Sequence, residues 1–242
     1  MVSDNQNIID PGVLKQAHTV LAGLNASERI AWSLNHTPAP HMLTSSFGAQ
    51  AAVMLHLVTE QHADIPVVVV DTGYLFPQTY TYIDLLVSRL KLNLIVARPL
   101  LSPAWQEARY GKRWETGPEG IKEYNQINKV EPLQRTMQEL GVGTWFTGLR
   151  REQSQSRKET PFIDVVNGRV KLQPIADWSL EMVSQYMIKH SLPVHPLLEQ
   201  GYASMGDWHS TTRLEPGMTE EETRFGGLIR ECGLHQSERS DI

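Results

Sequence analysis

The fold is decided by the stretch PVVVVDTGY at residues 66–74. Its β-branched run is short and ends in turn residues, as expected of a buried strand in a parallel sheet. Before this strand, residues 49–61 repeat their apolar side chains at a helical period, and another strand is expected at residues 42–44. These three segments predict one strand-helix-strand unit.

The same alternation continues toward the C-terminus. Helices are expected near residues 78–91 and between residues 103 and 140, with strands near residues 94–97 and 144–147. Regular alternation of this kind is typical of an open, mostly parallel sheet with helices on both faces. The sequence therefore predicts an α/β fold.

Two helices are expected before the sheet begins. Asp10 followed by Pro11 is typical of a helix N-terminus, and Ser27 is expected to cap a second short helix. Residues 1–40 are therefore interpreted as an N-terminal helical part, followed by an α/β domain over residues 41–212.

The pattern changes toward the C-terminus. The pair Asn167-Gly168 favours a two-residue turn between two strands. Beyond Ser191 the sequence is irregular, with few periodic apolar residues. We expect residues 213–242 to form a mobile tail, and this tail contains Cys232.

Composition narrows the function classes. A chain of 242 residues that is 40% hydrophobic can bury a large core, and its formal net charge of −5 argues against a general binder of nucleic acid or membrane surfaces. No apolar stretch is long enough to span a membrane, and the polar start does not resemble a signal peptide, so a cytoplasmic location is expected. One cysteine cannot form an internal disulfide or supply a cysteine-based cluster, and the histidines lack metal-binding spacing, so no metal site is expected.

Polar residues follow the first two predicted strands. Ser45, Ser46 and Gly48 lie between a strand end and a helix start, where free N–H groups and hydroxyls suit a phosphate. Spacing alone slightly favours an ordinary N-cap with a tight turn. Asp71 and Gly73 follow the next strand and reach the same edge of the sheet, although Asp71 could instead cap its own turn.

Cations are expected at this edge too. Lys129 precedes a predicted helix, and Arg150 and Arg157 belong to the run that follows the strand at residues 144–147. Arginine can hold phosphate or sulfonate oxygens in a bidentate manner. Most arginines are only solvated or paired at a surface, so the position after a strand is the stronger part of this argument.

The single cysteine stands in the segment RECGLH at residues 230–235. Base rates favour a buried structural role for a lone cysteine. The surroundings of Cys232 are charged, however, and Arg224, Arg230 and His235 could stabilise a thiolate. A reactive thiol fits this segment better.

Five blocks together resemble the phosphoadenylyl-sulfate reductase family, and the resemblance spans about residues 28–235. The blocks are SSFG at 45–48, DTGYLFP at 71–77, KVEP at 129–132, GLRR at 148–151 and ECGLH at 231–235. The family's fold resembles that of the ATP pyrophosphatases, the adenine nucleotide α-hydrolase-like proteins, which agrees with the α/β fold predicted above.

Relatives that reduce adenylyl sulfate carry an iron–sulfur cluster on a Cys-Cys and a Cys-x-x-Cys pair. In this chain the corresponding positions are Tyr124 and Asn125, and Asp207 and Ser210. All four thiols are missing. The resemblance therefore implies the cluster-free branch, which acts on 3′-phosphoadenylyl sulfate and has no bound cofactor.

The resemblance also implies a mechanism. The Cys232 thiolate would attack the sulfonate sulfur, expel adenosine 3′,5′-bisphosphate and become an S-sulfocysteine, with His235 as its catalytic neighbour. Because the chain has no second cysteine, an external dithiol, thioredoxin or glutaredoxin, would release the sulfite. The family implies a role in assimilatory sulfate reduction, for cysteine biosynthesis, and a homodimer.

Substrate contacts are carried over from the same resemblance. The nucleotide is assigned to Ser45, Ser46, Gly48, Asp71, Gly73, Lys129, Arg150 and Arg157. The sulfonate or the 3′-phosphate is assigned to Arg213 and Arg224.

Two other functions remain open at this point. One is an ATP-pyrophosphatase-like adenylyltransferase, although Ala49 and Gln50 stand where that family's loop has its acidic and neighbouring residues. The other is a non-enzymatic nucleotide-binding protein that uses Cys232 as a redox switch. Sulfite formation with reduced thioredoxin distinguishes these from the reductase.

Overall fold

The computed structural model describes residues 10–219 and 222–227. Its sheet has six strands in the order β3-β2-β1-β4-β6-β5. All neighbouring pairs are parallel except β5 with β6. The strands are β1 (His41–Thr44), β2 (Pro66–Val70), β3 (Asn93–Ala97), β4 (Thr144–Phe146), β5 (Ile163–Val166) and β6 (Arg169–Leu172). The predicted open, mostly parallel α/β sheet is confirmed.

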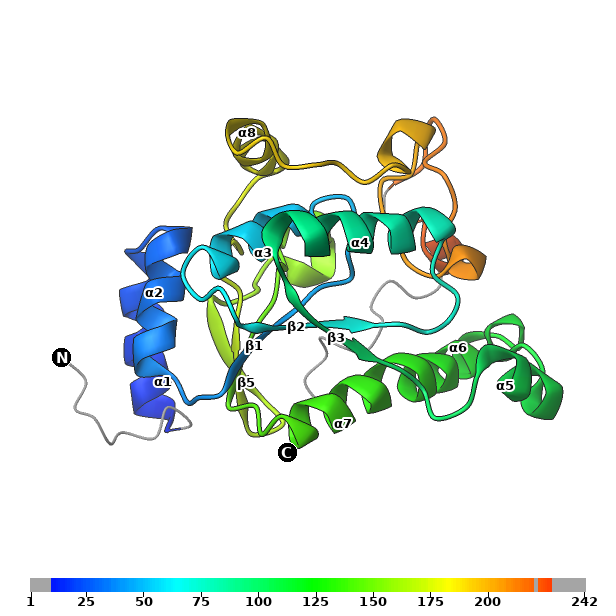
Figure 1. The fold of residues 1–242 in the computed structure, drawn as a ribbon, viewed down its shortest axis with the longest axis horizontal. Helices are drawn as coiled ribbons and strands as arrows, with labels where there is room; N and C mark the ends of the chain where they lie inside the picture. Colours follow the sequence, from blue (N-terminus) through cyan, green and yellow to red (C-terminus); the bar gives the residue numbers. More distant parts are fainter. Residues whose placement is uncertain (1–9, 220–221, 228–242) are drawn as a thin grey trace.

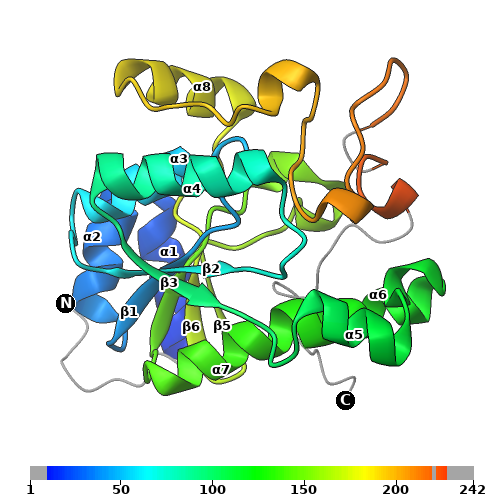
Figure 2. The same cartoon turned by 45° about the vertical axis from the view of Figure 1, so that its right-hand side comes forward.

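Helices cover both faces of the sheet. They are α1 (Pro11–Ala22), α2 (Ala26–His36), α3 (Ala51–Thr59), α4 (Pro77–Leu90), α5 (Pro103–Tyr110), α6 (Pro118–Asn125), α7 (Glu131–Glu139) and α8 (Leu180–Lys189). Helices α3 and α4 lie on one face with α8 above them, and α7 lies on the other face (Figures 1 and 2). Among the described residues, no helix has the length and apolar character that a membrane crossing requires.

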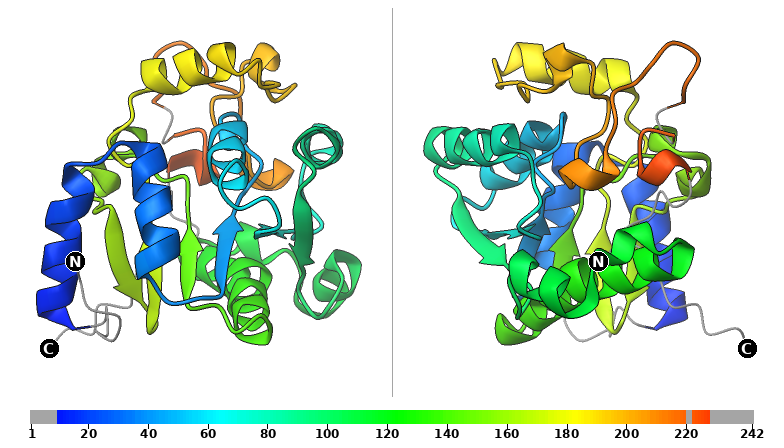
Figure 3. Two further views of the ribbon diagram at one scale, coloured as in Figure 1. Left: turned by 60° about the vertical axis from the view of Figure 1, so that its left-hand side comes forward. Right: turned by 90° about the vertical axis from the view of Figure 1, so that its right-hand side faces the viewer.

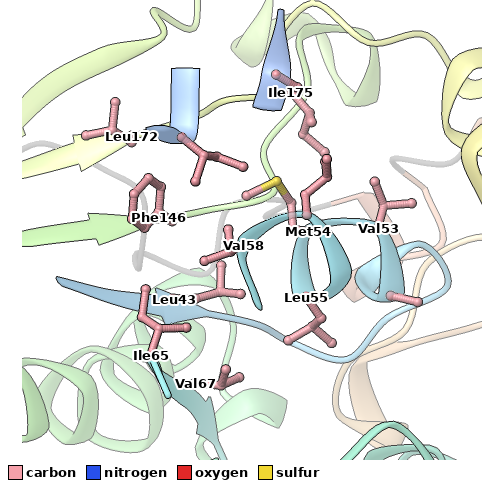
Figure 4. Packing of buried hydrophobic residues seen from close by; sticks show 14 of the residues in the cluster. Leu43, Val53, Met54, Leu55, Val58, Ile65, Val67, Phe146, Leu172 and Ile175 are labelled. Atoms are coloured by element: carbon pink, nitrogen blue, oxygen red, sulfur yellow. The ribbon is translucent and has the colours of Figure 1, made fainter. Parts of the chain in front are cut away.

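The main core lies between the sheet and α3. This helix is apolar almost all round, and Val53, Leu55 and Val58 are fully buried. They belong to one cluster with Leu43 of β1 and Phe146 of β4 (Figure 4). A helix that is apolar on every side is stable only inside a protein, which fixes α3 against the sheet.

A second, smaller core occupies the opposite face. Met42, Val68 and Trp145 come from three strands, and Leu133 and Met137 come from α7. Because side chains alternate along a strand, β1 and β4 send successive residues into the two cores in turn. Both faces of the sheet are therefore buried, as expected of parallel strands.

The connections that lead to the two neighbours of β1 cross opposite faces of the sheet. From β1 it passes through α3, on one face, to β2. It reaches β4, the other neighbour of β1, through α7 on the opposite face. A crevice opens at such a switch point, beyond the carboxyl ends of β1 and β4, and open α/β sheets bind ligands there.

The N-terminal helices share the main core. Asp10 caps α1 as predicted, since its side chain accepts hydrogen bonds from the amides of Gly12 and Val13. The cap of α2 differs from the prediction: it is Asn25, in a capping box with Glu28, and not Ser27. Helix α1 contacts β5 at one edge of the sheet (Figure 3).

A buried arginine ties α2 to the far end of the sheet. Arg29 is 3% exposed and forms a bidentate pair with Asp177, at 2.7 and 2.9 Å. Its guanidinium also donates to the carbonyls of Leu21 and Pro174 and lies 3.6 Å from the ring centre of Phe162. One side chain therefore joins the N-terminal helices to the segment that follows β6.

Candidate functional site

A cavity of about 310 Å³ lies at the carboxyl edge of the sheet. It is lined by the loop after β1, the end of β2, the start of α7, the loop after β4, residues 203–207 and Arg224. The segment around residues 201–210, in orange in Figure 2, lies beyond the ends of the strands. The cavity thus occupies the crevice that the switch point opens between β1 and β4.

The loop after β1 supplies the hydroxyl groups. Ser45, Ser46 and Gly48 all line the cavity, as predicted from their position. Phe47 between them is fully buried with φ 50°, and its amide donates to Ser45 Oγ at 3.1 Å. Gln50 is the N-cap residue of α3, and its side chain makes no capping hydrogen bond. The ordinary side-chain N-cap is therefore absent from this helix start, where N–H groups favour an anion.

Two predicted arginines enter from the loop after β4. Arg150 is 4% exposed, and its guanidinium donates to Gln50 Oε1 at 2.6 Å and to the carbonyl of Trp178 at 3.1 Å. Arg157 donates to Gln153 Oε1 at 2.7 Å. Arg150 also pairs with the Glu152 carboxylate at 3.2 Å. These partners hold both guanidinium groups at the wall of the cavity.

A buried ion pair forms another part of the wall. Lys129 Nζ lies 2.8 Å from Asp207 Oδ2, and Asp207 also accepts from the hydroxyls of Tyr124 at 3.0 Å and Thr72 at 2.5 Å. Burial by itself would raise the pKa of Asp207, but the Lys129 ammonium and these hydrogen bonds outweigh burial and lower the pKa to about 2. Asp207 is therefore a carboxylate at neutral pH.

The charge of the cavity is strongly positive. Of its described lining residues, four are cations, namely Lys129, Arg150, Arg157 and Arg224, and one, Asp207, is a carboxylate. Arg224 donates to Thr211 Oγ1 at 2.6 Å. Such an excess of buried or half-buried cations favours a ligand with several negative charges.

A second cavity, of about 400 Å³, has several aromatic side chains in its lining. Trp114, Trp208, His209 and Phe225 line the second cavity, and His209 stacks on Trp114 with ring centres 3.9 Å apart. Burial lowers the pKa of His209 to about 4, so its ring is neutral at pH 7. Because Trp208 and His209 follow Asp207 directly, the two cavities share this stretch of chain.

The structure brings together the four positions that the family resemblance matches to the cluster cysteines of other relatives. Tyr124 donates to Asp207, Ser210 Oγ donates to the Asp207 carbonyl at 3.1 Å, and Asn125 is buried next to Tyr124. Hydroxyl, amide and ion-paired carboxylate groups do not fit an iron–sulfur cluster, which needs thiolates. Within the described ranges, no group of three or more His, Cys, Asp or Glu side chains is placed to hold a metal ion.

Three predicted contacts lie elsewhere. The Asp71 carboxylate accepts from the Gly73 amide at 2.9 Å, from Tyr80 at 2.6 Å and from Arg98 at 3.1 Å. It thus stabilises its own turn, in which Gly73 has φ 78°, and neither residue is among those that line the cavity. Arg213 is exposed and lies over the ring of Tyr202. Cys232 and His235 fall outside the described residues.

Sequence reasoning also missed residues that line the cavity. Thr72 is one of them, and strand alternation could have identified it, because Val68, Val70 and Thr72 share one face while Asp71 lies on the other. Asp207 and Gly206 are others. They come from an irregular segment, where no periodicity indicates which way a side chain points.

Comparison with known proteins gives consistent results. The family model for the phosphoadenosine phosphosulfate reductase domain matches residues 40–213. A phosphoadenosine 5′-phosphosulfate reductase of Xanthomonas oryzae pv. oryzae is 59% identical over 216 residues, which cover 89% of this chain and 90% of the relative. One from Yersinia enterocolitica is 59% identical over 217 residues, covering 90% and 89%.

Solved structures agree with the sequence relatives. The phosphoadenylyl-sulfate reductase of Candida auris, in a phosphate complex, matches with a TM-score of 0.75 and 28% identity, covering 86% of this chain and 100% of that one. The FMN adenylyltransferase of Candida glabrata matches with a TM-score of 0.59 and 13% identity, covering 98% and 79%. At that identity the second match indicates a shared fold alone.

Proposed function

This chain belongs to the phosphoadenosine phosphosulfate reductase family, and we propose that it reduces 3′-phosphoadenylyl sulfate to sulfite and adenosine 3′,5′-bisphosphate with thioredoxin as electron donor. As a member of this family the chain is an oxidoreductase. The electron donor, the covalent intermediate and the place in assimilatory sulfate reduction are the proposed parts, together with a cytoplasmic homodimer.

The observation that supports the proposal most strongly is the charge of the cavity. Among the residues that the structure describes, four cations and one carboxylate line a space of about 310 Å³, which is within the range of small-molecule sites. A nucleotide with a 5′-phosphosulfate and a 3′-phosphate carries several negative charges. Its phosphate and sulfonate oxygens would interact favourably with the cations that line the cavity.

We assign the phosphosulfate to the side of the cavity near α3. Ser45, Ser46 and Gly48 would offer hydroxyl and N–H donors, and Arg150 and Arg157 would offer charge. Such preorganised donors stabilise the charge that develops on a leaving phosphate. Lys129 and Arg224 would hold the remaining anionic groups, and Asp207 keeps Lys129 in place through the 2.8 Å ion pair.

The proposed chemistry has two steps. The Cys232 thiolate attacks the sulfur of the sulfonate, the bond from sulfur to the bridging oxygen breaks, and adenosine 3′,5′-bisphosphate leaves with that electron pair. A thioredoxin thiolate then attacks the Cys232 sulfur, sulfite leaves, and the second thioredoxin thiol resolves the mixed disulfide. The sulfur is reduced by two electrons and thioredoxin is oxidised to its disulfide.

A first prediction tests Cys232, which is the only cysteine of the chain. Cys232→Ser should abolish sulfite formation, because an alcohol is a much weaker nucleophile than a thiolate at neutral pH. Binding of adenosine 3′,5′-bisphosphate should stay within about twofold of the wild type, since the cavity is built by other residues. Intact mass spectrometry of the wild type with substrate and no thioredoxin should show one added SO₃ group at Cys232.

Two results would contradict the proposal. Turnover by the Cys232→Ser variant would rule out the covalent intermediate. A wild-type protein that binds the nucleotide but makes no sulfite with reduced thioredoxin would instead support a non-enzymatic, redox-sensing role.

A further inference from the structure

Thr147 carries a buried hydroxyl group that finds no partner within the part of the chain that the structure describes. The residue follows β4 directly, is 1% exposed and lines the cavity. Its amide is satisfied, because it donates to the Leu172 carbonyl at 2.8 Å. Its Oγ1 has no hydrogen-bond partner among residues 10–219 and 222–227. Leaving a buried hydroxyl unpaired costs free energy, and such groups often mark a contact made by a ligand.

The direction of the Thr147 side chain follows from the sheet. Trp145 of β4 belongs to the core on the α7 face and Phe146 to the core on the α3 face, so alternation returns Thr147 to the α7 face. Val68 and Val70 of β2 and Leu133 of α7 line the cavity on this same face. Thr147 therefore stands beside an apolar part of the cavity.

The two sides of the cavity suit different chemical groups. Apolar side chains such as Val68 and Leu133 suit the faces of a flat ring, whereas Arg150 and Arg157, on the side of α3, suit phosphate and sulfonate oxygens. A hydroxyl among apolar side chains supplies the directional contact that a ring or a sugar needs for recognition.

We propose that the Thr147 hydroxyl hydrogen-bonds the nucleoside part of the substrate, the adenine base or its ribose, and so contributes to specificity. This proposal rests on the proposed function, because it takes the ligand to be an adenine nucleotide. It adds a residue outside the blocks that carry the family resemblance to those that bind the substrate.

The chain offers a matched control for the test. Thr144, at the other end of the same short strand, is 0% exposed and its Oγ1 also lacks a partner among the described residues, but it does not line the cavity. Thr147→Val and Thr144→Val each remove one unpaired hydroxyl and keep a β-branched side chain. Neither change should lower thermal stability, because no hydrogen bond within the described protein is lost.

Binding of adenosine 3′,5′-bisphosphate and of adenosine 5′-monophosphate is measured by calorimetry. Thr147→Val should weaken the binding of both nucleotides by about tenfold, which is the effect of losing one neutral hydrogen bond. Thr144→Val should bind like the wild type, and Thr147→Ser should restore most of the affinity, because it keeps the hydroxyl.

The outcomes separate this inference from the proposed function. If the wild type binds neither nucleotide, both fail together. If the wild type binds them and Thr147→Val binds equally well, the Thr147 contact is wrong while the proposed function stands. A loss for the bisphosphate without a loss for the monophosphate would place the hydroxyl at the 3′-phosphate and overturn the assignment to the nucleoside.

Discussion

His195 is a buried histidine whose two ring nitrogens are both engaged. It is 0% exposed, its Nε2 lies 3.1 Å from Thr79 Oγ1, and its Nδ1 accepts the Leu197 amide at 3.1 Å. An Nδ1 that accepts an amide hydrogen cannot also carry a proton. Burial lowers the pKa of His195 to about 4. The ring therefore stays neutral in the folded protein at pH values well below the usual histidine pKa.

This histidine predicts a loss of stability in mild acid. Below pH 6.5 the unfolded chain binds a proton at His195 while the folded chain does not, so folding becomes less favourable as the pH falls from about 6.5 toward 4. Urea unfolding should show that the free energy of unfolding is lower at pH 5.0 than at pH 7.5, with a contribution from this residue on the order of 1–2 kcal/mol. His195→Gln should be less stable at pH 7.5 and less dependent on pH.

A second, half-buried histidine contributes to the same dependence of stability on pH. His209 has a similarly low pKa, so the His195→Gln variant should keep part of the dependence on pH. A variant whose stability falls between the two pH values as steeply as that of the wild type would show that His195 does not titrate in this window.

At the scale of single residues, the sequence predicted position better than orientation. Ser45 and Arg150 line the cavity because each lies shortly after a strand end, which hydrophobic periodicity reveals. Asp71 also lies just beyond a strand, yet it faces away from the cavity and Thr72 faces into it. Charge made Asp71 the more conspicuous candidate, whereas alternation along the strand decides which side chain enters.

At the scale of elements, local signals predicted most of the fold. The run of valines is β2, and Asn167-Gly168 forms the hairpin turn with φ of 50° and 72°. The antiparallel pairing that this turn imposes on β5 was therefore implied by two residues. The cap of α2 was misplaced by two positions because Asn25, which completes the capping box, precedes the more obvious Ser27.

The sequence predicted least about the structure of the segment after Ser191. It contributes to the cavity through isolated contacts, such as the bridge between Leu75 and Asp207 and the amide of Trp208 donating to the Tyr74 carbonyl at 2.8 Å. Contacts of this kind have no period in the sequence, so they become visible only in the folded chain. The division into residues 1–40, 41–212 and 213–242 stays a prediction.

Within this segment, Gly206 leaves room for Arg224. A Cβ on Gly206 would collide with the Arg224 guanidinium, which is the far end of a flexible side chain and can move aside. Gly206→Ala should therefore change stability little but push Arg224 out of the cavity wall. We expect adenosine 3′,5′-bisphosphate to bind about tenfold more weakly by calorimetry, the effect of one charge-assisted hydrogen bond.

Gly23→Ala is the matched control, because Gly23 has φ −86° and its new Cβ would come no closer than 3.6 Å to any neighbour. It should bind the nucleotide like the wild type. Equal binding by the two alanine variants would show that the position of Arg224 does not matter for the ligand.

At the scale of the whole molecule, the N-terminal helices and the sheet form one packed body. Ala17 and Leu21 of α1 and Ile30 of α2 belong to the same core cluster as Phe146 of β4. Arg29 adds hydrogen bonds and an ion pair between helix α2 and the segment that follows β6. Unfolding should therefore be cooperative across all of these elements.

Arg29→Gln tests this cooperativity. The change removes the ion pair to Asp177 and leaves buried carbonyls without their donor, which should cost about 3 kcal/mol. Circular dichroism and tryptophan fluorescence should report the same lowered midpoint. Lys122→Gln, which breaks an exposed pair with Glu119, should stay within about 0.5 kcal/mol of the wild type. Separate transitions for the two probes would contradict a single cooperative body.

The positive cavity lies inside a chain whose formal net charge is −5. At physiological ionic strength the field of surface charges is screened within about 8 Å, whereas buried charges are screened far less. An anion approaching from bulk solvent is therefore not drawn in by the molecule as a whole. It encounters attraction only at the mouth of the cavity, so selection for anions occurs at contact, and diffusional encounter gains no long-range steering.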